Sequence, residues 1–181
     1  MNILIFDTET TGLLPKENCK KEDLPRIIEV GAALVNENGI IRELSKLVNP
    51  QTIIPKAATK INKITNEMVA SSPTFVHVLP DLIDLFSISD VLVCHNASFD
   101  TGMLNIELEL MKFSYFPWPH QTICTVREFE HEFGYRPTLK ELYNKYIGHE
   151  LEQKHRALDD VKALYEVLLT SGLLDRLNER T

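Results

Sequence analysis

The sequence has few cysteines, no long apolar run and no excess of basic residues, and each absence narrows what the protein can be. The three cysteines, Cys19, Cys94 and Cys124, are odd in number and widely spaced, which indicates free thiols rather than a disulfide framework. No apolar stretch reaches membrane-spanning length, and residues 1–12 lack the basic start and apolar stretch of a signal peptide. We therefore expect a cytoplasmic protein with no membrane partner.

The net charge of −7 argues against a protein that coats nucleic acid with a broad basic surface. Nucleic-acid binders that depend on counterion release usually present a basic face. Local basic clusters occur at residues 16–26 and 56–63, and they fit solvated loop charges as well as phosphate contacts. Any polyanionic substrate is therefore expected to be held at a small site, such as a chain end, with help from cations.

The length and patterning predict one mixed α/β domain. At 181 residues with 44% hydrophobic residues, the chain is long enough for a real core, and it shows no repeats or linkers. We assign residues 1–175 to this domain and 176–181 to a short tail. Apolar runs predict strands at residues 2–6, 26–36, 40–48, 91–94 and near 122, with a hairpin turn at 37–39. Helical patterns cover residues 73–86, 98–111, 126–133, 139–146 and 155–169, and residues 12–25 and 112–124 read as loops.

Three short segments far apart in the chain supply four carboxylates and a histidine. They are residues 6–10 (Phe-Asp-Thr-Glu-Thr), 95–100 (His-Asn-Ala-Ser-Phe-Asp) and 155–160 (His-Arg-Ala-Leu-Asp-Asp). Mg²⁺ and Mn²⁺ prefer oxygen ligands, and a pair of such ions stabilises the attacking and leaving oxygens of a phosphoryl displacement. Histidine is the side chain best placed to take a proton from water near neutral pH. The inventory indicates a metal-dependent phosphodiesterase.

Each acidic residue also fits a simpler role when it is considered alone. Asp7 and Glu9 share one face of a strand end, which is unfavourable without a cation but also fits a solvated acidic loop. Asp100 could cap the helix that begins beside it. Asp159 and Asp160 both lie in a first helical turn, where the helix dipole favours a carboxylate. Together the segments make the simpler roles improbable.

The order and spacing of the three segments resemble the motifs of the DEDD superfamily of 3′→5′ exonucleases, in its histidine branch. That branch places the histidine five residues before the last aspartate, as His155 precedes Asp160, whereas the tyrosine branch would place tyrosine at Arg156. Residues 6–13 (Phe-Asp-Thr-Glu-Thr-Thr-Gly-Leu) are most similar to the proofreading epsilon subunits of bacterial DNA polymerase III. The resemblance runs from about residue 2 to about residue 170 and implies a ribonuclease H-like fold with a five-stranded mixed sheet flanked by helices.

This resemblance implies an enzyme that releases nucleoside 5′-monophosphates from single-stranded or frayed 3′ ends of DNA. It assigns two Mg²⁺ or Mn²⁺ ions to Asp7, Glu9, Asp100 and Asp160, and the general base to His155. Residues five positions apart, as His155 and Asp160 are, lie on poorly matched faces of an ideal helix, so we expect His155 to precede the first turn, on a loop over the site. Substrate contacts are expected from Thr8, Thr10, Leu13, Asn62, Asn96 and Phe99. A DNA polymerase is a candidate partner.

Two of the substrate positions have a more detailed interpretation. Leu13 stands where similar enzymes wedge an apolar side chain against the terminal base. Residues 61–65 (Ile-Asn-Lys-Ile-Thr) resemble the family's Ile-His-Gly-Ile-Thr stretch, with Asn62 in place of histidine and Lys63 in place of glycine. We expect Lys63 to offer a phosphate contact in place of stacking by a ring.

Several alternatives stay open at this point. An exoribonuclease of the RNase T or oligoribonuclease kind would use the same carboxylates, because discrimination depends on 2′-hydroxyl contacts. A polymerase-associated binding module is a further alternative, although such a module has no use for uncompensated carboxylates. A triad of Ser98, His155 and Asp160 lacks the Gly-x-Ser-x-Gly elbow. His120 and Cys124 lack the other ligands that a closed zinc site needs.

Overall fold

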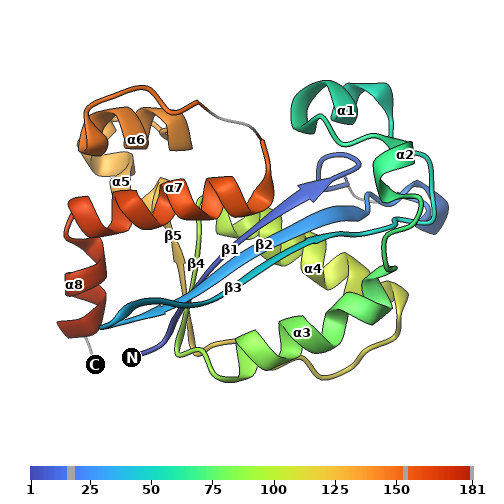
Figure 1. The fold of residues 1–181 in the computed structure, drawn as a ribbon, viewed down its shortest axis with the longest axis horizontal. Helices are drawn as coiled ribbons and strands as arrows, with labels where there is room; N and C mark the ends of the chain where they lie inside the picture. Colours follow the sequence, from blue (N-terminus) through green and yellow to red (C-terminus); the bar gives the residue numbers. More distant parts are fainter. Residues whose placement is uncertain (16–18, 153–154, 180–181) are drawn as a thin grey trace.

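A computed structural model describes residues 1–15, 19–152 and 155–179, and in this part of the chain five strands form one mixed sheet (Figure 1). The strands are β1 (Ile3–Thr10), β2 (Ile27–Asn36), β3 (Gly39–Leu47), β4 (Val91–Cys94) and β5 (Gln121–Cys124). Their order across the sheet is β3-β2-β1-β4-β5. The first three strands are antiparallel, and β4 and β5 add parallel strands. The predicted five-stranded mixed sheet is confirmed.

Helices cover both faces of this sheet (Figure 1). They are α1 (Lys56–Asn62), α2 (Asn66–Val69), α3 (Phe75–Ser87), α4 (Ala97–Leu110), α5 (Thr125–Phe133), α6 (Leu139–Ile147), α7 (Ala157–Thr170) and α8 (Leu173–Glu179), with a 3₁₀ turn, η1, at Lys21–Asp23. Alternate residues of a strand point to opposite faces. Accordingly Leu4 and Phe6 pack with α3 and α4, whereas Ile3 and Ile5 pack with α5 to α8. None of the described helices is long and apolar enough to cross a membrane.

The boundaries differ from the predicted ones in three places. β1 continues to Thr10, past the predicted strand at residues 2–6, because its pairing with β2 continues through Glu9 opposite Glu29. The short helices α1 and α2 were not predicted, because few apolar residues anchor them. Ile64 and Val69 belong to a small separate core beside these helices. Residues 176–179, which we assigned to a tail, belong to α8 and bury Leu177. The domain boundary at residue 175 remains a prediction.

The strand alternation sends the functional side chains of β1 in two directions. Asp7 and Glu9 continue the face of Ile3 and Ile5, toward α7, while Thr8 continues the opposite face, toward α4. β4 pairs with β1 at Ile3–Ile5, so the rest of β1 extends past the end of β4. The first turn of α4 lies beside this extension. Two helices can therefore reach one strand end from opposite faces of the sheet.

Gly31 lets α7 begin directly against the sheet. It is the partner of Asp7 in the register between β1 and β2. A Cβ at this position would lie 2.3 Å from the carbonyl carbon of Ala157 and 2.4 Å from the nitrogen of Leu158. Backbone therefore packs on backbone here, which brings the first turn of α7 close to the carboxylates of β1.

We expect Gly31→Ala to destabilise the protein by about 1 to 3 kcal/mol, the usual cost of overpacking, because the obstructing atoms belong to backbone and not to a flexible side chain. Urea unfolding measures the change. Gly12→Ala is the matched control, since its Cβ would meet Pro25 at 3.9 Å, an ordinary contact. Equal unfolding midpoints for the two variants would contradict the proposed role of Gly31.

Candidate active site

Three carboxylates from two distant segments meet at the end of β1. Asp7 and Glu9 come from the strand and Asp160 from the first turn of α7, and one oxygen of each lies within 4.8 Å of the others. Asp160 is buried, whereas its neighbour Asp159 is exposed. The structure therefore places Asp160, the residue chosen from the sequence, in this group, which we call the acidic cluster.

Asp100 approaches the same strand end from α4. Its Oδ1 accepts hydrogen bonds from the Thr8 amide at 3.0 Å and from the Thr8 hydroxyl at 2.8 Å. Asn96 is the N-cap residue of α4, so Asp100 does not have the capping role that its position also suggested. Asp100 is 3% exposed and its charge acts on Asp7. It therefore belongs to the same electrostatic unit as the acidic cluster.

The carboxylates of this unit are unusually hard to ionise together. Burial, and then repulsion by Asp100, Asp160 and Glu9, raises the pKa of Asp7 well above its ordinary value. Burial and repulsion by Asp160 raise the pKa of Glu9 to about 8. Burial raises the pKa of Asp100 to about 7, against the effect of the Thr8 hydrogen bonds. Oxygen donors that repel one another in this way fit divalent cations, whose charge would offset the repulsion.

Glu29 is a supporting residue that we did not identify from the sequence. It faces Glu9 across the β1–β2 register and is 1% exposed. The Arg156 guanidinium donates to both of its oxygens, with Nε at 3.0 Å from each and Nη2 at 2.6 Å from Oε1. The Ala157 amide donates to Oε2 at 3.1 Å. This ion pair fixes the start of α7 to β2. The sequence signal that could have identified Glu29 is its position as a single glutamate within the apolar run of residues 27–35.

His155 lies two residues before the first residue of α7, as the spacing predicted. It is half-buried and has a left-handed backbone, with φ of 50°. Within the described residues, the group of three close ligand atoms does not include His155. Its neighbour Arg156 is held by Glu29, so the backbone that carries the imidazole is anchored on its C-terminal side. The role of His155 as a base remains a prediction.

The residues that follow the acidic strand include an exposed apolar side chain. Leu13 is 82% exposed, as a residue that wedges against a base would be. The hydroxyl of the buried Thr10 donates to the carbonyl of Gly12 at 2.7 Å, which shapes the turn before Leu13. The hydroxyl of Thr8 is directed to Asp100. Contacts of these three residues with substrate remain predictions, and the two threonines have visible roles in holding the site together.

Asn62 joins α1 to the end of β1. It is 2% exposed, its Nδ2 donates to the Thr10 carbonyl at 3.3 Å, and its Oδ1 accepts from the Ile64 amide at 3.1 Å. A hydrogen bond with Glu9 lowers the pKa of that carboxyl against the effect of burial. Lys63 ends α1 in the left-handed region with φ of 60°, a conformation that glycine adopts readily. A substrate contact by Asn62 remains a prediction.

The other predicted positions have ordinary surroundings. Asn96 Oδ1 accepts from Arg136 Nη2 at 3.4 Å, and Phe99 is half-buried against the core on the α4 side. Arg26, from the basic cluster at residues 16–26, pairs with buried Glu107 at 2.8 Å. This arginine is therefore engaged in an ion pair within the protein, which fits neither of the two roles left open for its cluster, a solvated loop charge or a phosphate contact.

Comparison with known proteins assigns the chain to a class. The exonuclease family RNase_T matches residues 4–168, and the chain belongs to this family, as a DEDD exonuclease. Among curated proteins it is similar to the epsilon subunit of DNA polymerase III from Treponema pallidum, with 36% identity over 91% of this chain and 74% of that protein. The corresponding subunit from Rickettsia typhi is 33% identical over 97% of this chain and 80% of that protein.

Solved structures agree with this assignment. Exonuclease X in complex with 5′ overhanging duplex DNA has a TM-score of 0.66 at 29% identity, over 94% of this chain and 93% of that one. The nuclease domain of 3′hExo, a DEDDh family member bound to rAMP, has a TM-score of 0.75 at 22% identity, over 96% and 94% of the two chains. The predicted ribonuclease H-like fold is confirmed.

The raised pKa values predict an unusual dependence of stability on pH without cations. The ordinary values for Glu9 and Asp100 are 4.5 and 3.8, and the folded protein raises them to about 8 and about 7. Stability that comes from protonating these groups is complete below the ordinary values and is lost as the pH rises through the folded ones. In EDTA, the melting temperature should fall from pH 5 to above pH 8, and Mg²⁺ or Mn²⁺ should raise it most at the alkaline end.

Asp7→Asn should reduce both the pH dependence and the effect of cations, because it removes one charge from the unit. Asp175→Asn, at an exposed site on α8, is the control and should leave both unchanged. A cation-free melting temperature that stays constant or rises across this range would show that the carboxylates do not repel one another as the structure indicates.

Proposed function

We propose that this protein is a metal-dependent 3′→5′ exonuclease that removes nucleoside 5′-monophosphates from the 3′ ends of DNA. The observation that carries the proposal is the convergence of Asp7, Glu9, Asp100 and Asp160 at one strand end, with His155 at the start of α7. The similarity to DNA polymerase III epsilon subunits supports DNA as the substrate and a DNA polymerase as a partner. Exonuclease X, the structural relative in complex with DNA, supports the same substrate.

The acidic cluster and Asp100 are the groups that would hold Mg²⁺ or Mn²⁺. When bound, two such ions would stabilise negative charge on the attacking and leaving oxygens of the phosphodiester. Thr8 keeps Asp100 aimed at the end of β1 through two hydrogen bonds, and Asn62 holds the Thr10 carbonyl next to Glu9. Together these contacts fix the donor oxygens before any ion arrives, which is what a hard cation with a strict geometry requires.

His155 would accept the proton of the attacking water. Histidine is the side chain best suited to accept a proton from water in this way. The ion pair of Arg156 with Glu29 sets where the neighbouring backbone lies, and Leu13 would stack on the terminal base. The protein thus has separate groups to position the 3′ end of the nucleic acid and to move the proton.

A 3′→5′ exoribonuclease is the second candidate. The solved neighbour bound to rAMP has the same fold, and the same carboxylates would serve either sugar. We favour DNA because epsilon subunits of DNA polymerase III are among the relatives that are more than 30% identical to this chain and that it covers over most of their length.

Digestion of strands labelled at the 5′ end tests the function directly. Single-stranded DNA, a duplex with a mismatched 3′ end and RNA of the same sequence are incubated with Mg²⁺, Mn²⁺ or EDTA. We expect a ladder that shortens from the 3′ end of DNA with either cation and no digestion in EDTA. Asp7→Asn should abolish the ladder while the protein stays folded. Faster digestion of RNA would favour the second candidate, and near-wild-type turnover of Asp7→Asn would contradict the metal-dependent reading.

The role of His155 makes a separate prediction. His155→Ala should lower kcat by a factor of about 10² to 10⁴, the usual contribution of a positioned base, and leave KM nearly unchanged. Steady-state rates provide the test, with His131→Ala on the exposed side of α5 as the control. A variant that keeps the wild-type rate would assign the proton transfer to another group.

A further inference from the structure

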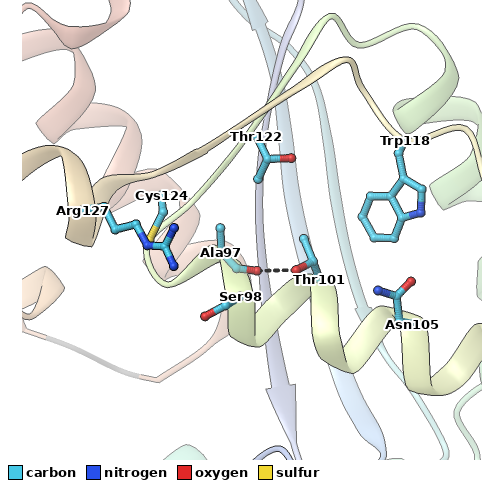
Figure 2. A pocket seen from close by; sticks show the side chains of 8 residues that line it. All are labelled: Ala97, Ser98, Thr101, Asn105, Trp118, Thr122, Cys124 and Arg127. Atoms are coloured by element: carbon cyan, nitrogen blue, oxygen red, sulfur yellow. Dashed lines mark hydrogen bonds between the residues drawn. The ribbon is translucent and has the colours of Figure 1, made fainter.

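An open cavity of about 420 Å³ lies on the α4 side of the sheet edge formed by β5. Figure 2 shows its side chains, which come from α4, the segment before β5, β5 itself and α5. They are Ala97, Ser98, Thr101, Asn105, Trp118, Thr122, Cys124 and Arg127. None belongs to the acidic cluster, and α4 connects the two places, because the same helix carries Asp100. We call this cavity the α4–β5 pocket.

One end of the α4–β5 pocket is basic. Arg127 lies there beside Cys124 (Figure 2), and it is exposed. A second exposed arginine, Arg136, donates to Asn96 at the start of α4. Among the residues that the structure describes, neither arginine forms an ion pair. In a chain of net charge −7, two arginines beside one helix start, with no acidic partner among the described residues, are suited to an anion that comes from outside.

The other end of the pocket has an aromatic wall. Trp118 is half-buried, and its ring is held by edge contacts with Phe86, at 5.6 Å between centroids, and with Phe116, at 5.0 Å. Asn105 lies near the indole and Thr122 lines the space between the two ends (Figure 2). A fixed aromatic ring, an amide and hydroxyl groups, with an arginine at the far end, match the base, sugar and phosphate of one nucleotide.

We propose that the α4–β5 pocket binds an upstream nucleotide of the single strand whose 3′ end lies at the acidic cluster. The base would stack on Trp118, and Arg127 would contact the phosphate. Arg136 would attract the strand between the two places. This proposal rests on the proposed function and adds to it: the strand is held by a second site, so its affinity does not depend on the cations alone.

The chain offers a direct probe of the pocket, because Trp118 is its single tryptophan. A short deoxythymidine oligonucleotide is titrated in EDTA, where we expect no digestion, and both tryptophan emission and the anisotropy of a labelled copy are recorded. We expect the emission to change in step with the anisotropy. Arg127→Ala should weaken binding about tenfold and lower the slope of log affinity against log salt by about 0.7, the value for one phosphate contact on a single strand. Arg42→Ala, on the opposite edge strand β3, is the control and should do neither.

Kinetics provide the second arm. Trp118→Leu keeps an apolar side chain against Phe86 and Phe116 but removes the flat ring. Because base stacking on an aromatic ring has a substantial affinity, this variant should lower kcat/KM for the oligonucleotide by at least about fivefold. A dinucleotide, too short to extend to the pocket, should be cleaved at the wild-type rate. Tyr115→Ala, an exposed aromatic outside the pocket lining, is the control.

Three results would overturn the proposal. One is oligonucleotide binding, seen by anisotropy, without any change in Trp118 emission. Another is an equal loss of kcat/KM for dinucleotide and oligonucleotide in Trp118→Leu, which would show that the ring is structural. In both cases digestion by the wild type would leave the proposed function intact. Absence of both binding and digestion would reject the pocket and the function together.

Discussion

Mutual repulsion among clustered carboxylates is the constraint on which the rest of this structure depends. Asp7, Glu9 and Asp160 lie together, with Asp100 beside them, and burial raises the pKa of Asp7, Glu9 and Asp100. Carboxylates that repel one another move apart unless neighbouring groups hold them in place. Three parts of the group are held by other elements: Thr8 holds Asp100, Asn62 holds the Thr10 carbonyl beside Glu9, and the anchored start of α7 positions Asp160.

The need to hold these carboxylates together also explains where the scaffold packs most closely, between β2 and α7. Gly31 permits direct backbone contact between β2 and α7 next to Asp7, and Glu29 joins the same two elements through Arg156. Glu29 adds a further negative charge close to Glu9 and Asp7, and the guanidinium offsets it. Glu29 thus positions α7, the helix that carries Asp160. The charge of Glu29 is balanced by Arg156, the residue next to His155.

More of the candidate site than of the surrounding scaffold could be predicted from the sequence. The three motifs could be found because each is local, and the position of His155 before α7 followed from helical spacing alone. The extension of β1 to Thr10 could not be found in this way, because it depends on pairing with β2 and not on apolar residues. The contact between Glu29 and Arg156 spans 127 residues, so only the fold reveals it. α1 and α2 are short, and tertiary contacts rather than periodicity define them.

The separation of the site residues along the chain has a consequence for synthesis on the ribosome. β1, β2 and β3 lie within the first 47 residues and can pair early, but α7 begins at Ala157. A nascent chain therefore carries the acidic strand long before it carries Asp160 or His155. Because domains form as their segments emerge, the acidic site is assembled last, when the final large helix docks on Gly31. Every N-terminal fragment that ends before α7 lacks Asp160 and His155, so the acidic cluster cannot form until this last part of the domain has been made.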